Sequence, residues 1–189
     1  GLSTYFGSYK GANVFVPITV RAGDLLVVHV HNGDSGNAVG PAGWTRYRSD
    51  THTTGGTDNY APEHAVWTRV ATAADVGAVY AWTGNWTDWV ANLVAYRGTN
   101  LRIDAAGGAN SARVNTQTTA TLPSLTSGGG SRRAVVFTSF ASTTSTAPTL
   151  SGTLDGLTDT QQVKSGNRTA LMSERTVGAG AQGPWRVTS

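Results

Sequence analysis

The stretch 79–98, VYAWTGNWTDWVANLVAYRG, contains two apolar segments separated by the polar turn GNWTD. In its second segment, 88–98, successive side chains alternate between two faces, as they do in a β-strand. One face is wholly apolar and carries Trp89, Ala91, Leu93 and Ala95. This segment therefore predicts a well-formed strand with Trp89 in the core. Trp82, close to the turn, fits either the core or the surface.

Further short apolar segments lie on both sides of this stretch and are separated by Gly-, Ser- and Asn-rich turns. The predicted strands are 13–20, 24–30, 44–49, 63–71, 79–84 and 88–98, then 114–123, 131–141, 154–163, 167–177 and 183–189. Pro17 is expected at an edge or bulge, and 71–77 is long enough for one helical turn. Short strands with frequent turns predict an all-β, antiparallel β-sandwich of jelly-roll type.

The order of these elements recurs, which predicts an internal duplication with an offset of about 105 residues. GDLLVVHVH, PAGWTRYRSDT, HAVWTRVATAADVG and AVYAWTG in the first half correspond to SRRAVVFTSFA, LDGLTDTQQVKSG, RTALMSERTVGAG and AQGPWRVTS in the second. The expected halves are 1–104 and 105–189. The second has no counterpart of 88–98, so its sheet is expected to have an open edge filled by more chain or by a neighbour.

Composition excludes several classes of protein. Only 13% of the 189 residues are charged, the net charge of +3 comes from scattered arginines, and no basic stripe indicates nucleic-acid binding. No apolar stretch approaches the length of a membrane span, and no signal peptide is visible. Without cysteine the chain has neither disulfides nor thiolate metal sites. We expect no cofactor.

Several motifs resemble a recurrent module of minor tail, tail-fibre and other virion proteins of phages that infect actinobacteria, which also occurs in secreted bacterial proteins. The resemblance covers about residues 14–104. It is carried by Gly23-Asp24-Leu25, Pro41-Ala42-Gly43-Trp44, Arg69-Val70-Ala71, Asp75, Gly77 and Ala95-Tyr96-Arg97-Gly98. These are scaffold positions, and the family pattern brings no catalytic set.

The resemblance implies a jelly-roll-like sandwich used for display, attachment or recognition. We therefore expect a non-enzymatic structural and recognition module of a phage particle, at the tail, a fibre or the capsid surface. Its partners would be other virion proteins or further copies of itself, and cell-wall polysaccharide is the leading ligand. Two alternatives stay open. One is a secreted bacterial carbohydrate-binding module, and the other is an architectural subunit completed by strand addition from a neighbour.

Residues that could support chemistry also have simpler explanations. The chain has two glutamates, Glu63 and Glu174, and a glycosidase would need two carboxylates facing one bond. Asp24 and Asp75 are most simply expected to cap or brace turns. His29 and His31 share one side of a strand, an arrangement that could hold a metal. No acidic cluster lies near them in sequence, so the expectation is no metal site and no catalytic residue.

The remaining candidate is Trp86, a large aromatic residue in the turn GNWTD. Sugars stack on aromatic rings while nearby Asn or Asp groups bind their hydroxyls. Asn85, Trp86 and Asp88 have this chemistry, and Asp58 and Tyr60 in loop 50–60 are expected at its rim. The alternative is that Trp86 folds back over the end of the sandwich. Trp44 and Trp67 lie within strand patterns and are expected in the core.

Overall fold

The computed structural model describes residues 2–5, 7–8, 11–32, 38–51, 63–84, 89–108, 119–128, 132–141, 159–165 and 168–188. The first part of the chain forms β1 (Leu2–Tyr5), β2 (Gly7–Ser8), β3 (Gly11–Phe15), β4 (Leu25–Asn32), β5 (Thr45–Thr51), β6 (Glu63–Val70), the 3-10 turn η1 (Ala73–Asp75), β7 (Val79–Thr83) and β8 (Trp89–Tyr96). The rest forms β9 (Thr119–Leu122), β10 (Leu125–Ser127), β11 (Arg132–Ala141), β12 (Asp159–Ser165), β13 (Arg168–Val177), β14 (Gly180–Gln182) and β15 (Trp185–Thr188).

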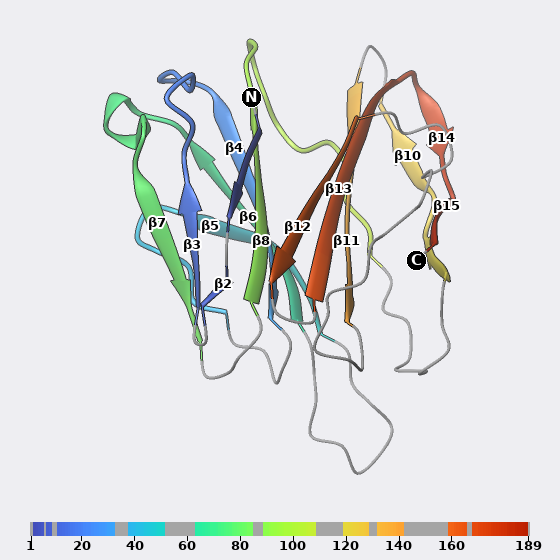
Figure 1. Cartoon of the computed structure of the whole chain (residues 1–189). Helices are drawn as coiled ribbons and strands as arrows, with labels where there is room; N and C mark the ends of the chain where they lie inside the picture. The colour runs from blue at the N-terminus through green and yellow to red at the C-terminus, as the bar shows by residue number, and fades with distance from the viewer. Residues whose placement is uncertain are drawn as a thin grey trace.

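The strands pair antiparallel throughout and confirm the all-β sandwich class. Jelly-roll connectivity and internal duplication stay predictions. The central sheet has the order β1-β8-β4-β6-β5, the flanking sheet β2-β3-β7 and the distal sheet β11-β13-β12. Two ladders, β9-β15 and β10-β14, form the end layer. Figure 1 shows these layers side by side, from the flanking sheet at the left to the end layer at the right.

Sequence and structure differ at a few elements. The first long predicted strand, 13–20, ends at Phe15, and Pro17 is neither a bulge nor an edge residue of a strand. Pro17 instead begins a turn in which its carbonyl accepts the Val20 N–H, because proline favours such turn positions and cannot donate to a ladder. The short strands β1, β2, β10 and β14 were not predicted, since two to four residues carry too little alternation to read.

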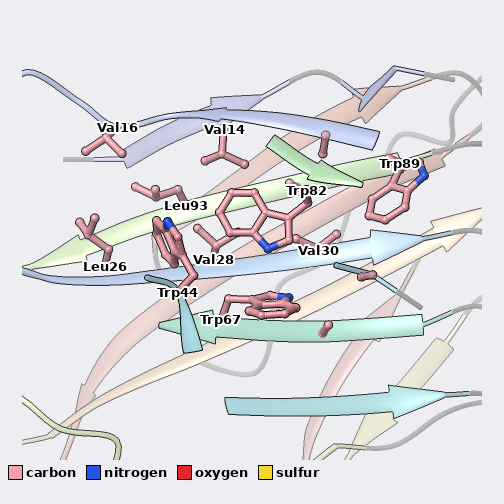
Figure 2. Close-up of a cluster of buried hydrophobic side chains, with 14 of the residues drawn as sticks. Val14, Val16, Leu26, Val28, Val30, Trp44, Trp67, Trp82, Trp89 and Leu93 are labelled. Carbon is pink, nitrogen blue, oxygen red and sulfur yellow. The ribbon is translucent and has the colours of Figure 1, made fainter. Parts of the chain in front are cut away.

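The main core lies between the central and flanking sheets. Inward-facing residues of β4, β6 and β8 meet Ala12 and Val14 of β3 and Trp82 of β7. Trp44, Trp67, Trp82 and Trp89 all belong to this cluster, as the alternation predicted for three of them. Figure 2 shows Trp82 between β3 and β4, with Trp44 beside it. The two indole rings make an edge contact at 5.0 Å between centroids.

A second, smaller core lies between the distal sheet and the end layer. Val136 of β11, Leu171 of β13 and Trp185 of β15 are buried there. Because side chains alternate along a strand, the neighbouring residues Phe137 and Met172 face the central sheet instead. The distal sheet is therefore covered on both faces, and the central sheet likewise.

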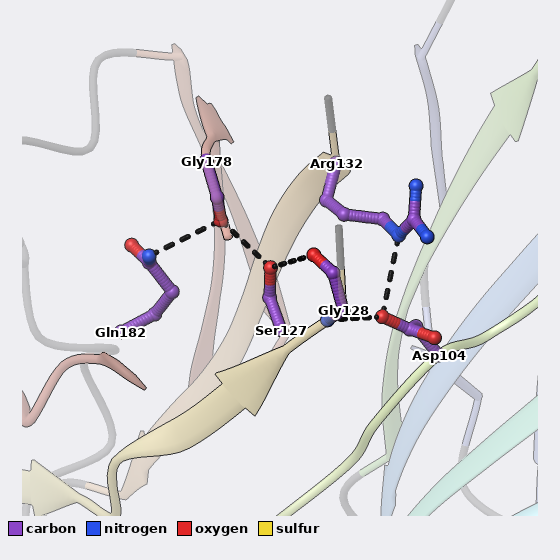
Figure 3. Close-up of polar contacts among 6 residues, drawn as sticks. All are labelled: Asp104, Ser127, Gly128, Arg132, Gly178 and Gln182. Atoms are coloured by element: carbon purple, nitrogen blue, oxygen red, sulfur yellow. Dashed lines mark hydrogen bonds and ion pairs between the residues drawn. The ribbon is translucent and has the colours of Figure 1, made fainter. Parts of the chain in front are cut away.

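The passage from β8 to the end layer is fixed by polar contacts at Asp104. Its carboxylate accepts the Gly128 N–H at 2.8 Å and pairs with Arg132 Nε at 3.2 Å. The Gly128 N–H, followed by Arg132, lowers the pKa of Asp104. Nearby, Ser127 Oγ donates to the Gly178 carbonyl at 2.7 Å, which also accepts the Gln182 amide (Figure 3). The contacts of Asp104 therefore fix the chain at the predicted boundary 104/105.

Gly43, in the turn before β5, offers the first test of the fold. Its φ is +80°, and an added Cβ would lie 2.0 Å from Arg69 Nη1. We expect Gly43→Ala to lower the free energy of unfolding by about 1–3 kcal/mol, from left-handed strain and displacement of Arg69. Urea unfolding measures the loss. Gly178→Ala is the control, since its Cβ would meet nothing within 4 Å. An equal effect of both would contradict the assignment.

Candidate functional site

We call the end of the central sheet that carries Asn32, Thr51, Glu63 and Trp89 the loop end. The contact residues predicted from the sequence belong to chain segments that adjoin it. Asn32 pairs with Glu63 on one side and Trp89 on the other, and Thr51 pairs with Glu63. The same end of this sheet is therefore the place where three chain segments start or finish: 33–37, 52–62 and 85–88. Asp58, Tyr60, Asn85, Trp86 and Asp88 themselves lie outside the described residues, and so does His52.

Glu63 anchors this end from inside the main core layer. Its carboxylate is buried and accepts the Ala38 N–H at 2.8 Å, Ser49 Oγ at 2.6 Å and Arg46 Nη1 at 3.2 Å. Arg46 also stacks over the Trp67 ring. A carboxylate that accepts from three donors is held in one position. Its role is to fix the chain around β5 and β6.

Glu174 lies on the other side of the central sheet, facing away from Glu63. Its Oε2 accepts the Tyr96 hydroxyl at 2.5 Å, and its Oε1 lies 4.0 Å from Arg133. Burial and this bond to Glu174 raise the pKa of Tyr96. The two glutamates thus occupy different layers and do not converge as a glycosidase pair must.

The motifs behind the family resemblance have structural roles. Asp24 accepts from Arg97 Nε at 2.9 Å and Nη2 at 2.7 Å, and it also accepts the Arg21 N–H. These bonds, the Arg97 bond foremost, hold the pKa of Asp24 below its ordinary value. Asp75 caps η1 by accepting the Thr72 N–H and hydroxyl. Both aspartates brace turns, as expected.

Three histidines meet between the central and distal sheets. His29 and His31 share one side of β4, as expected, and His64 lies on the neighbouring strand β6. His64 Nδ1 is 3.0 Å from His29 Nε2, and His64 Nε2 is 3.2 Å from His31 Nδ1. We call these three residues the histidine cluster. His29 and His31 are almost fully buried.

Asn92 of β8 lies beside the histidine cluster. His29 Nδ1 and both polar atoms of the Asn92 side chain are buried. Asn92 pairs with His29 in the strand register, and the Phe137 ring of β11 stacks on the His29 ring with 5.0 Å between the centroids. Burial, with His64 adding to it, holds the pKa of His29 well below its ordinary value, and the Asn92 amide opposes the shift.

The histidine cluster does not have the geometry of a metal site. Within the described residues no group of three or more His, Cys, Asp or Glu side chains is placed to bind one metal ion. The reason is visible in the distances, because His64 uses one ring nitrogen toward His29 and the other toward His31. A metal centre needs its ligand atoms to point at one shared position.

The same residues do not have the arrangement of a Ser-His catalytic site either. Ser139 Oγ lies 3.3 Å from His64 Nε2, and His29 contacts the opposite nitrogen, which gives the connectivity of a nucleophile, a base and an orienting group. However, His31 is nearer to the same Nε2. Ser139 sits within the regular β11–β13 ladder rather than on the sharp turn that exposes a nucleophile. The arrangement fits an interlayer contact.

Sequence reasoning missed His64 as the link of this cluster. The predicted strand 63–71 contains His64, but its pairing with β4, which sets His31 opposite His64, could not be read from the sequence. Comparisons of the chain with protein-family models, curated proteins and solved structures found no match. In the part of the chain that the structure describes, no helix has the length and apolar character needed to cross a membrane.

Proposed function

We propose that this chain is a non-enzymatic structural and recognition module of a phage particle, at the tail, a fibre or the capsid surface. The stacked sheets are a rigid support, and the segments that leave the loop end make the contacts. The observation that carries the proposal is the shared register of Asn32, Thr51, Glu63 and Trp89. It brings the ends of every segment with a predicted contact residue to one place.

The state of the polar groups supports a module without catalysis. Asp24, Glu63, Asp75 and Glu174 each bond to groups of the scaffold. An acid or base must instead reach a substrate and change its protonation during the reaction. The resemblance to virion modules, which rests on motifs that include Asp24 and Asp75, gives the biological setting. Cell-wall glycan is the proposed ligand, with Trp86 as the stacking residue.

Co-sedimentation with purified actinobacterial cell walls tests the recognition role. We expect the wild-type chain to be retained and Trp86→Ala to weaken binding about tenfold or more, as the loss of a central aromatic contact does. Phe15→Ala is the matched control, because Phe15 is 51% exposed and lies at the far end of β3 from Gly11, which pairs with Thr83.

Three results would contradict the proposal. Equal binding by wild type and Trp86→Ala would remove Trp86 as the contact residue. No retention of the wild type would reject the recognition role. Release of reducing ends from the cell walls, lost in Ser139→Ala or Glu63→Gln, would show an enzyme.

A further inference from the structure

The layer between the central and distal sheets differs in chemistry from the two cores. Its apolar contacts include Val90 with Ala170, and the buried Met172 faces the central sheet here. Its polar contacts include the Tyr96–Glu174 bond. The histidine cluster touches β11 through the stacking of His29 on Phe137 and through Ser139 Oγ, which lies 3.3 Å from His64 Nε2. Three of the four histidines in the chain thus lie in this layer, all of them on the central sheet. Their protonation bears directly on whether the two sheets stay together.

While the central and distal sheets are packed together, which we call the closed state, the histidine cluster can bind one proton more than three neutral rings carry. A neutral imidazole has one donor and one acceptor nitrogen, and the protonated ring has two donors. A proton on His64 lets both its nitrogens donate, one to His29 Nε2 and one to His31 Nδ1. A second proton, on His29 or His31, sets one N–H against another across about 3 Å and puts two positive charges side by side.

Separation of the sheets exposes the three rings, which all belong to the central sheet, to water, where each ring can turn away from its neighbours. Once in water, each imidazole titrates near its ordinary pKa of about 6.5, so all three take up a proton in mild acid. We propose that the histidine cluster is a proton-operated latch, which holds the central and distal sheets together while at least two of its histidines are neutral and lets them separate in mild acid. The latch does not depend on the proposed recognition role.

The surrounding charges fit this scheme. From β5, Asp50 lies opposite His64 in the register, and its carboxylate is paired with Arg48. On β8 the residue beside the cluster is Asn92, which has a neutral amide. On β11 the residues beside it are Ser139 and Phe137, which are also uncharged. Glu174 of β13 also lies in this layer, where it accepts the Tyr96 hydroxyl and lies 4.0 Å from Arg133 of β11.

The sign of the pH effect follows from the lowered pKa of His29, which burial causes. A group that is neutral in the folded state and charged when released stabilises the fold above its unfolded pKa of about 6.5 and loses that effect as the pH falls. Since the open state binds about two more protons than the closed state, the unfolding equilibrium constant should rise about 50- to 100-fold between pH 6 and pH 5.

Urea unfolding across pH 7.5 to 5 measures this rise. His29→Gln and His31→Gln each leave one neighbour for His64, so we expect the rise to fall to about tenfold. Tyr96→Phe is the control: it weakens the same layer at the Glu174 bond and should keep the full rise. NMR of the four histidine rings gives an independent reading, in which two rings of the cluster stay neutral until the protein opens.

Layer separation can be followed directly because the chain has no cysteine. Spin labels on Thr45→Cys in the central sheet and Ala181→Cys in the end layer, both exposed, should give one narrow distance distribution at pH 7.5 and a longer, broader distribution at pH 5. The latch is overturned if the unfolding constant is flat between pH 6 and 5, if the two variants keep the full rise, or if the label distance is unchanged at pH 5.

Discussion

Trp82→Ala is expected to lower the free energy of unfolding by about 3–5 kcal/mol, the range for a large aromatic residue removed from a packed core. Trp82 is 0% exposed and lies between the central and flanking sheets. Its ring contacts Trp44 edge-on, and the chain beside it is tightly packed, since a Cβ on Gly11 would lie 2.4 Å from the Trp82 carbonyl oxygen. The surrounding strands have little freedom to fill the space.

Trp82→Phe separates the loss of packing from the loss of the polar group. The indole N–H of Trp82 is buried and has no hydrogen-bond partner, so removing it relieves an unmet polar group while most of the ring volume is kept. We expect this variant to lose about 1–2 kcal/mol, less than Trp82→Ala. Urea unfolding followed by circular dichroism gives both values. A loss below about 1 kcal/mol for Trp82→Ala would mean that the main core lies elsewhere.

The core could be predicted from the sequence because strand alternation is local. Trp89 and Leu93 fall on the apolar face of 88–98, and both are buried in the main core. From its own segment alone, Trp82 fitted either the core or the surface. Its burial follows from the pairing of β7 with β3, in which Ala12 lies opposite Trp82. Contacts of that kind depend on register, which a single strand does not specify.

The histidine cluster shows the same limit at a candidate site. The alternation of β4 placed His29 and His31 on one side, but His64 joins them from 33 residues away along the chain. Ser139 and Phe137 come from β11, still further along. The local pattern therefore predicted two members of the cluster, and the packing of the distal sheet on the central sheet supplied the rest. The predicted glycan residues lie outside the described part of the chain and stay a prediction.

Asp75→Ala is expected to cost about 3–5 kcal/mol, because it leaves a largely buried arginine without its partner. Asp75 is 0% exposed, and Arg69 Nε lies 2.9 Å from its Oδ1. The same carboxylate accepts the Thr72 N–H at 2.6 Å and bonds to the Tyr80 hydroxyl. The substitution therefore also removes the cap of η1 and the group that orients Tyr80 against Arg69. Asp104→Ala, at an ion pair exposed to solvent, is the control and should cost much less.

The contribution of Asp75 to stability changes in a lower pH range than the contribution of the histidines. Burial raises the pKa of Asp75, but the bonds from Tyr80, Thr72 and Arg69 outweigh it and lower the pKa to about 2. A carboxyl whose pKa is depressed on folding stabilises the protein above its unfolded value of about 3.9 and loses that contribution as the pH falls toward 2. Asp75→Asn should therefore flatten the stability curve between pH 4 and pH 2 and leave the region from pH 6 to pH 5 unchanged. Urea midpoints measured in both regions check this, and an Asp75→Asn curve parallel to the wild type below pH 4 would show that Asp75 is not ionised in the folded protein.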